Sequence, residues 1–299
     1  MVAHRVVRLS RQVPDLEAAR RFYRQFGLEE TAPGVFASVL GGDQLFLREG
    51  PRPAIDAIVL GVDSEDDIHG IRARLESRGV TVDVEGAAIS AVEPITNLRF
   101  EFLVANRLEP DPVIAPRTTA DRADLVPREA VRPLRLGHVV LGCTDVEAAK
   151  GFFLDGIGMR LSDYVTGGPF MRFETDHHNL VLVPAPMTLL HHTAWKVRGI
   201  DEIGYGGSQM IENHPERHAW GLGRHAASAN YFWYLKDPAG AFAEYYYSEM
   251  DELADSPSFW DPVPESEGLP VAVWASPPLT ERPLVPEAMP APILTADGR

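Results

Sequence analysis

Two imidazoles and one carboxylate in the second half of the chain are of the right types to bind a metal ion together. They belong to His138 in LGHVVL, His192 in LHHTAW and Glu244 in AFAEYYY. Two histidines and one carboxylate form the facial triad that holds non-haem Fe(II), with Mn(II) as an alternative, and leaves the opposite positions open for a substrate and O₂. These residues therefore predict an open metal site suited to oxygen chemistry.

Alternation along the segments decides which histidines can share one site. Each segment is expected to be a strand, and successive strand residues point to opposite faces of a sheet. Only one of His191 and His192 can therefore face the site, and aligning LGHVVL with LHHTAW places His138 opposite His192. Glu244 lies in the last strand, where its charge would be costly on an apolar face unless it is paired or bound to a cation.

The two halves of the chain resemble each other. Residues 4–26 and 134–153 each contain a short apolar strand, a turn that ends in Asp15 or Asp145, and a helix with Glu-Ala-Ala near its start. Each Asp is expected to cap its helix. Further strand-and-helix segments repeat at 54–80 and 189–212, and closing strands at 98–106 and 242–250. The order β-α-β-β-β is expected twice in each half.

This repeat predicts two modules with a linker and an extension. The predicted parts are an N-terminal module at 1–112, a linker rich in Pro, Arg and Asp at 113–132, a C-terminal catalytic module at 133–250, and a Pro-rich extension at 251–299.

The N-terminal module serves as an internal control for the metal prediction. A lone strand histidine is more often structural than a ligand, so the joint occurrence of three ligand-type residues carries the argument. In the same register Arg8 takes the place of His138, Ala57 takes the place of His192, and only the acid persists, as Glu101. We therefore predict one metal site, in the C-terminal module, and none in the N-terminal module.

Composition narrows the possible partners and the compartment. The formal net charge of −15 argues against nucleic acid, which requires clustered Lys and Arg. The single cysteine, Cys143, allows no disulfide within the chain, and the first residues contain no apolar signal core. No apolar run approaches the ~18 residues needed to cross a bilayer. We expect a cytoplasmic protein without membrane partners.

A longer motif surrounds the predicted glutamate ligand. The stretch GRHAASANYFWYLKDPAGAFAEYYY (223–247) contains, in order, His225, Tyr234, Asp237, Pro238, Gly240 and Glu244. In this motif, and in the histidine pairs of DHHNL and LHHTA, the chain resembles the vicinal oxygen chelate superfamily and, within it, the type I extradiol ring-cleaving dioxygenases. One departure is Trp233, where that family usually has an aliphatic residue.

The resemblance implies fold, chemistry and further site residues. The fold would be α+β, with tandem βαβββ modules that each form a cupped mixed sheet. A catecholic diol and O₂ would meet on Fe(II), and the aromatic ring would open beside the two hydroxyls. His178 would be the acid/base, Tyr234 would hydrogen-bond a substrate hydroxyl, and His225 would bond the ligated oxygen. A homo-oligomer is also implied.

Neighbouring residues have less specific expectations. His177 and His191 are expected to point outward or to hydrogen-bond the scaffold. The candidates for an apolar pocket wall are Phe170, Met171 or Phe173, Trp195 and Tyr246.

Three alternatives remain beside extradiol cleavage. Hydroquinone-ring cleavage uses the same ligand types, so catechol is not the only ring that fits. Glyoxalase or epimerase chemistry commonly draws four ligands from both modules, and Arg8 and Ala57 count against it. A non-catalytic small-molecule-binding protein of the bleomycin-resistance kind would lack the triad.

Overall fold

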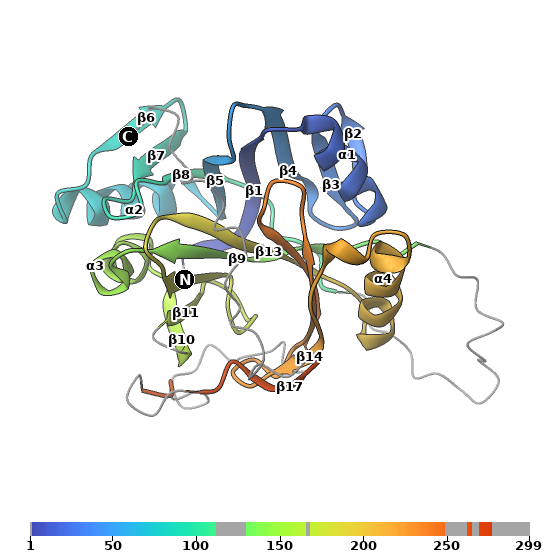
Figure 1. Ribbon diagram of the computed structural model, residues 1–299. Coiled ribbons are helices and arrows are strands. Elements are labelled where there is room, and N and C mark those ends of the chain that lie inside the picture. Colours follow the sequence, from blue (N-terminus) through green and yellow to red (C-terminus); the bar gives the residue numbers. More distant parts are fainter. Residues whose placement is uncertain (1, 112–129, 166–167, 249–261, 265–268, 277–299) are drawn as a thin grey trace.

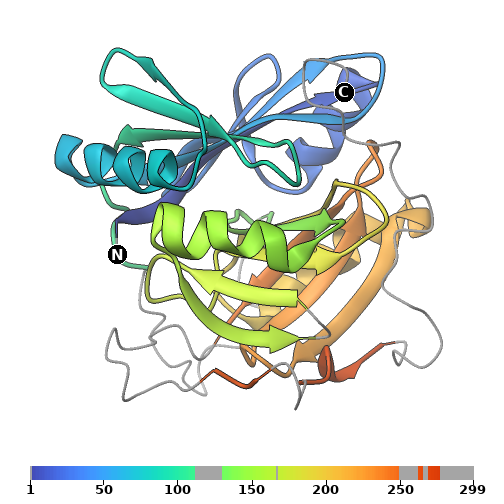
Figure 2. The ribbon, with the colours of Figure 1, turned by 90° about the vertical axis from the view of Figure 1, so that its left-hand side faces the viewer.

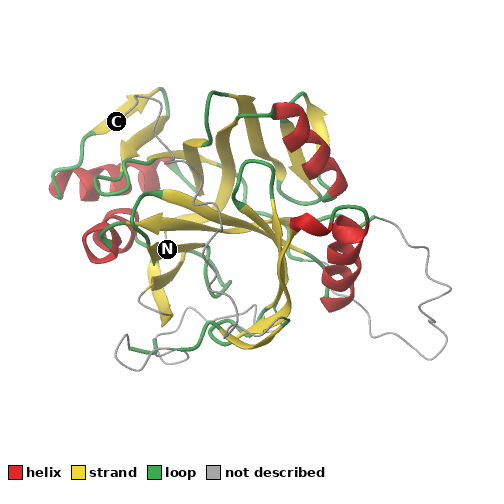
Figure 3. Ribbon diagram, in the orientation of Figure 1, coloured by secondary structure: helices red, strands yellow, loops and turns green. Residues whose placement is uncertain are grey.

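Two mixed β-sheets, one from each half of the chain, dominate the molecule (Figure 3). The structure is a computed structural model, and it describes residues 2–111, 130–165, 168–248, 262–264 and 269–276. Figure 1 shows the N-terminal sheet, in blue and cyan, above the C-terminal sheet, in green to orange. Helices are few and lie beside the sheets rather than between their strands.

The N-terminal sheet has eight strands in the order β2-β3-β4-β1-β5-β8-β7-β6. Its strands are β1 Ala3–Val13, β2 Glu29–Ala32, β3 Val35–Ser38, β4 Gly42–Glu49, β5 Ala54–Val62, β6 Val82–Glu85, β7 Ala88–Val92 and β8 Arg99–Val104. Its helices are α1 Leu16–Gln25 and α2 Glu65–Ser77. Each helix follows the first strand of a βαβββ unit, and the two units join through antiparallel pairing of β1 with β5.

The C-terminal sheet repeats this plan and adds one strand, in the order β10-β11-β12-β9-β13-β16-β15-β14-β17. Its strands are β9 Arg135–Cys143, β10 Arg160–Val165, β11 Gly168–Arg172, β12 Leu180–Pro184, β13 Leu189–Lys196, β14 His218–His225, β15 Tyr231–Lys236, β16 Phe242–Tyr247 and β17 Ala272–Ala275. Its helical segments are α3 Val146–Gly151, the π-helical η1 Phe152–Ile157, α4 Ile200–Glu212 and the 3₁₀ turn η2 Pro215–Arg217. The prediction of an α+β fold with tandem βαβββ modules is confirmed.

The helix starts follow from local hydrogen bonding. The carboxylate of Asp15 accepts a hydrogen bond from the backbone N–H of Ala18 at 2.8 Å, and Asp145 accepts one from Ala148 at 3.0 Å. Each satisfies one of the N–H groups that a helix leaves unpaired in its first turn. The two predicted caps are therefore confirmed.

Contacts between the modules fix the C-terminal sheet against the N-terminal one. The rings of Phe26 and Tyr245 stack with centroids 4.0 Å apart, and the Tyr245 hydroxyl donates to the Phe26 carbonyl at 2.8 Å. An aromatic pair of this kind contributes about 0.5–1.5 kcal/mol beyond its buried area. Figure 2 shows α2 above the α3–η1 segment, where Arg74 donates to the carbonyl of Gly156 at 3.0 Å.

A buried ion pair anchors the turn that leads into β16. Arg11 of β1 donates to Asp237 at 2.6 Å, and the Tyr23 hydroxyl donates to the same oxygen at 2.9 Å. The other Asp237 oxygen accepts from the backbone N–H groups of Ala239 and Ala241. Breaking such a buried pair by removing one partner costs about 3–5 kcal/mol. The N-terminal module therefore helps to position the strand that carries Glu244.

Parts of the sequence predictions lie outside the described residues. Most of the predicted linker falls within 112–129, and much of the extension falls within 249–261, 265–268 and 277–299. The module boundaries remain predictions. In the described part of the chain, no helix is both long enough and apolar enough to cross a membrane.

Candidate metal centre

Three neighbouring strands of the C-terminal sheet bring the predicted ligands to one face. In the sheet register, Ala194 of β13 lies between His138 of β9 and Glu244 of β16. His192 precedes Ala194 by two residues and therefore shares its face. The small side chain of Ala194 leaves room between the imidazoles and the carboxylate. The predicted pairing of His138 with His192 is wrong, because His138 pairs with Ala194 and His192 pairs with Val140. The three side chains nevertheless share one face and come together.

The three ligand-type atoms converge closely. His138 Nε2 lies 3.3 Å and His192 Nε2 lies 3.2 Å from Glu244 Oε2, and the two Nε2 atoms are 3.4 Å apart. All three residues are buried. Neither oxygen of Glu244 has a well-aligned hydrogen bond from a described residue. A buried carboxylate without such bonds is costly unless a cation neutralises it, so this donor set fits a divalent metal.

The protonation states of these groups suit metal binding. Burial lowers the pKa of His192 to about 3, so its imidazole is neutral near neutral pH. Burial alone would raise the pKa of Glu244, but its interactions with His138 and His192 outweigh burial and hold the pKa well below the usual range. Metal ligands must be neutral imidazoles and ionised carboxylates, which is the state favoured for His192 and Glu244.

His178 lies against the cluster from the β11–β12 side. Its ring centroid is 4.1 Å from that of His138, and Phe170 lies 4.8 Å from His178. Tyr246 covers another side of His138, with ring centroids 4.9 Å apart. Phe170 and Tyr246 are therefore the predicted wall residues that face the centre. The remaining candidates, Met171, Phe173 and Trp195, belong to the hydrophobic core instead.

Tyr234 and His225 approach from β15 and β14. Tyr234 is the cross-strand partner of Glu244, and its ring lies 5.0 Å from that of His192. The Tyr234 hydroxyl and His225 Nε2 are 3.0 Å apart, and that nitrogen is 3.9 Å from Glu244 Oε1. Burial raises the pKa of Tyr234 well above its usual value, so the hydroxyl keeps its proton. All six predicted site residues lie around one point.

The adjacent histidines are hydrogen-bonded rather than outward-facing. His191 Nδ1 lies 2.7 Å from His192 Nδ1, and His177 Nε2 lies 2.7 Å from Asp163 Oδ2. The register of β13 against β9 shifts between Leu190 and His192, and this irregularity interrupts the strict alternation there. Of the two predictions made for His177, hydrogen bonding to the scaffold is therefore confirmed.

Sequence reasoning did not find Asp163 or the backbone groups of the C-terminal segment. Asp163 is fully buried, and its Oδ1 accepts from the N–H of Val263 at 2.8 Å. The carbonyl of Val271 lies 2.7 Å from His225 Nδ1. The polar residue in the strand LSDYV was an available signal for Asp163. The backbone contacts of Val263 and Val271 have no comparable signal in the sequence, because every residue except proline has the same backbone groups.

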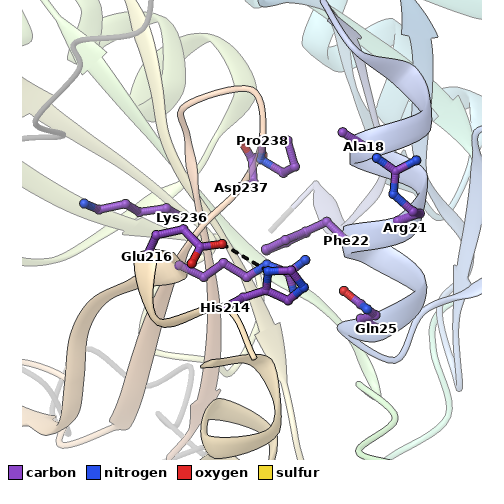
Figure 4. A pocket seen from close by; sticks show the side chains of 10 residues that line it. Ala18, Arg21, Phe22, Gln25, His214, Glu216, Lys236, Asp237 and Pro238 are labelled. Atoms are coloured by element: carbon purple, nitrogen blue, oxygen red, sulfur yellow. Dashed lines mark hydrogen bonds and ion pairs between the residues drawn. The ribbon is translucent and has the colours of Figure 1, made fainter. Parts of the chain in front are cut away.

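A separate cleft lies between the modules. It has a volume of about 410 Å³ between α1 and the turn after β15. Figure 4 shows Phe22 extending from α1 toward His214 and Glu216, which are paired at 3.1 Å. The guanidinium of Arg217 lies 5.4 Å from the centre of the Phe22 ring. None of the six predicted site residues lines this cleft, so the metal centre is a different place.

Comparisons with known proteins agree with the fold and identify the family. Residues 135–245 match the model of the Glyoxalase/Bleomycin resistance protein/Dioxygenase superfamily. Metapyrocatechase 2 of Cupriavidus necator is 32% identical over 259 residues, covering 81% of this chain and 80% of that protein. The 3-methylcatechol 2,3-dioxygenase of Pseudomonas putida is 27% identical over 220 residues, covering 64% of this chain and 71% of that protein.

A solved structure supports the same architecture. The Mn(II)-bound glyoxalase from Novosphingobium aromaticivorans superimposes with a TM-score of 0.79 at 24% identity, covering 100% of this chain and 99% of that one. This likeness concerns the fold alone. The family follows from the superfamily match and the similarity to metapyrocatechase 2. The chain belongs to the vicinal oxygen chelate superfamily and, within it, to the extradiol ring-cleaving dioxygenases.

Proposed function

We propose that this chain opens the ring of a catecholic diol with O₂, beside the two hydroxyls, at a non-haem Fe(II) held by His138, His192 and Glu244. One observation carries the proposal: two imidazoles and one carboxylate converge at a buried point of the C-terminal sheet. The names of metapyrocatechase 2 and 3-methylcatechol 2,3-dioxygenase support the substrate class.

The ligand set decides which metals are suitable. Two imidazoles and one carboxylate on one side suit Fe(II), and Mn(II) accepts the same donors. When bound, the metal supplies open coordination positions for adjacent substrate oxygens and for O₂, and the redox chemistry that activates both. The relative that holds Mn(II) with this fold makes Mn(II) the alternative to test.

The surrounding side chains have separate roles in the proposal. His178 takes a proton from a catechol hydroxyl and returns it later, which suits an imidazole because it transfers protons in both directions near neutral pH. Tyr234 keeps its proton, and in the structure its hydroxyl lies 3.0 Å from His225 Nε2, which holds the phenol in place. When the substrate binds, the hydroxyl turns its single hydrogen from His225 to a substrate oxygen. Phe170 provides an apolar surface for the ring.

The described residues of the N-terminal module add no fourth ligand to the cluster. Within the described residues, the cluster that is able to hold a metal contains only His138, His192 and Glu244, all from the C-terminal sheet. Glyoxalase and epimerase sites that draw ligands from both modules therefore fit less well than the three-ligand oxygenase site.

A cytoplasmic location and a homo-oligomeric state belong to the same proposal. Cys143 is a buried free thiol, which fits a reducing compartment in which Fe(II) also persists. Light scattering coupled to size exclusion measures the oligomeric state: a mass above the 33.0 kDa of one chain supports an oligomer, and a monomer contradicts it.

The test is ring cleavage by the reconstituted protein. The chain is purified without oxygen, loaded with Fe(II) or Mn(II), and mixed in air with catechol, 3-methylcatechol or 2,3-dihydroxybiphenyl. We expect O₂ uptake and a yellow ring-opened product, a semialdehyde from catechol and a keto acid from the substituted diols, whose mass shows both oxygen atoms incorporated. Metal-loaded protein that consumes no O₂ with any of these diols, or with hydroquinone, contradicts an oxygenase.

A further inference from the structure

A chain of three buried side chains lies behind His178. His178 Nδ1 is 3.1 Å from His177 Nδ1, and His177 Nε2 is 2.7 Å from Asp163 Oδ2. All three residues are buried. The proposed reaction uses His178 but assigns nothing to the other two, although a buried carboxylate next to two imidazoles is a costly arrangement unless every hydrogen bond is made.

The positions of the protons along this chain follow from Asp163. Its Oδ1 accepts from the backbone N–H of Val263 at 2.8 Å while its Oδ2 faces His177, so both oxygens act as acceptors. An ionised carboxylate has no proton to give, so His177 Nε2 must carry the hydrogen and donate it. A neutral His177 then has only a lone pair at Nδ1.

The same reasoning determines the tautomer of His178. Because His177 Nδ1 is an acceptor, the hydrogen between the two rings belongs to His178 Nδ1. A neutral His178 then has a lone pair at Nε2. Among the described residues, the hydrogen bond to His177 is the one that His178 makes. Its Nε2 is therefore an uncommitted base, on a ring that lies against His138.

The C-terminal segment anchors both histidines that serve the proposed chemistry. Val263 fixes Asp163, and through His177 it acts on His178. The carbonyl of Val271 accepts from His225 Nδ1 at 2.7 Å, which leaves His225 Nε2 to accept from the Tyr234 hydroxyl. Backbone groups at two points of one segment thus hold the two sides of the site.

We propose that Asp163 and His177 are positioning residues that, with the Val263 amide, hold His178 in the tautomer whose Nε2 is free to accept a substrate proton. The inference rests on the proposed extradiol function for the identity of that proton. The tautomer itself is independent of turnover and is measured separately.

The decisive variant is Asp163→Asn. The Val263 N–H requires an acceptor, so the new amide must turn its oxygen toward Val263 and its NH₂ toward His177. The amide then donates to His177 Nε2, His177 Nδ1–H donates to His178, and the proton of neutral His178 moves to Nε2. Since general base catalysis contributes about 10²–10⁴-fold, we expect kcat to fall by a factor in this range while KM and metal affinity stay unchanged.

Tautomers are read directly by two-bond proton–nitrogen NMR of histidine-labelled, full-length protein loaded with diamagnetic Zn(II). We expect His178 to carry its proton on Nδ1 in the wild type and on Nε2 in Asp163→Asn. The exposed Asp83→Asn is the matched control and should change neither spectrum nor kcat. Retention of the Nδ1 proton in Asp163→Asn, or an unchanged kcat in a variant with the reversed tautomer, overturns the proposal.

A second variant tests the role of the Val263 amide. It also distinguishes a change of tautomer from a loss of folding, because a misfolded protein would not regain activity. Val263→Pro removes the N–H, so in the double variant with Asp163→Asn the amide is free to turn its oxygen to His177. We expect the double variant to regain the Nδ1 tautomer and part of the lost kcat. A double variant as impaired as Asp163→Asn, with its proton still on Nε2, contradicts the assigned role of Val263. Absence of ring cleavage by the wild type would overturn the proposed function, whereas the NMR result would still decide the tautomer.

Discussion

The N-terminal and C-terminal modules each have a glutamate at the same position of the sheet, but they differ in what balances its negative charge. In the N-terminal sheet Val59 lies between Arg8 and Glu101, as Ala194 lies between His138 and Glu244 in the C-terminal sheet. Arg8 approaches Glu101 at 3.5 Å, so the acid there is neutralised by a cation that is part of the chain. Glu244 has the imidazoles of His138 and His192 instead, and in the proposed site its cation comes from outside.

Burial separates the two sites further. The side chain of Glu101 is 28% exposed and that of Glu244 is fully buried. Water solvates the first carboxylate, and the Arg8 guanidinium also lies 4.8 Å from the centre of the Phe46 ring. The comparison teaches that the acid alone does not make a metal site. The proposed metal site combines burial of the acid with histidines in place of both Arg8 and Ala57.

The largest difference between the modules should appear when each acid is neutralised. Glu244→Gln removes the one anionic ligand, and we expect metal affinity to fall by more than the about 10–100-fold that outer-sphere changes cost. Glu101→Gln should leave affinity unchanged. Anaerobic titration with Mn(II), followed by electron paramagnetic resonance, measures both. Loss of metal in Glu101→Gln would show that the N-terminal module takes part in binding.

Substitution of His192 should reduce metal binding and activity more than substitution of the adjacent His191. His192→Ala removes a ligand, so we expect it to abolish metal binding and activity. His191→Ala removes only the group that is 2.7 Å from His192 Nδ1, and outer-sphere partners of this kind are worth about 10–100-fold in affinity or activity. Asp56→Ala, at the matching position of the N-terminal module, is the control. A greater loss from His191→Ala than from His192→Ala would show that the strand register is off by one.

Transplanting the ligands should create a second, weaker site. Arg8→His with Ala57→His places two imidazoles beside Glu101, so we expect a second metal ion per chain at high Mn(II) concentration. The site should be weaker than the native one because Glu101 is partly exposed and no imidazole orients the new histidine at position 57. Arg8→His alone provides only one imidazole and should bind none. A stoichiometry that does not rise in the double variant would mean that ligand identity is not sufficient in this fold.

The smallest effect concerns stability. Removing the half-exposed Arg8–Glu101 pair with Glu101→Gln should change the free energy of unfolding by about 0–1 kcal/mol, as for other pairs near the surface. Urea denaturation of the metal-free protein measures this. A loss of several kcal/mol would indicate that the N-terminal ion pair is a structural anchor.

The sequence was sufficient for the fold and for the convergence of His138, His192 and Glu244 because both depend on periodic patterns. The repeat gave the βαβββ order, and Asp15 and Asp145 marked two helix starts. Strand alternation selected His192 over His191, although the predicted pairing of His138 with His192 is wrong. These features depend on side-chain types at regular spacing, which a single sequence displays directly.

The contacts behind the triad depend on irregular geometry instead. The register of β10 shifts between Leu161 and Asp163, and that of β13 shifts before His192, so alternation does not place the neighbouring polar groups. Val263 and Val271 act through their backbone atoms, which every residue possesses. The sequence therefore predicted the residues of the cluster but not the groups that orient the histidines around it.

Anomalous X-ray scattering at the iron edge, from crystals loaded anaerobically with Fe(II) and a catechol, would locate the metal and the substrate together. We predict one iron peak per chain, bonded to His138 Nε2, His192 Nε2 and a carboxylate oxygen of Glu244, with the adjacent catechol oxygens on the same iron. A peak beside Arg8 and Glu101, or a catechol bound away from the iron, would contradict this prediction.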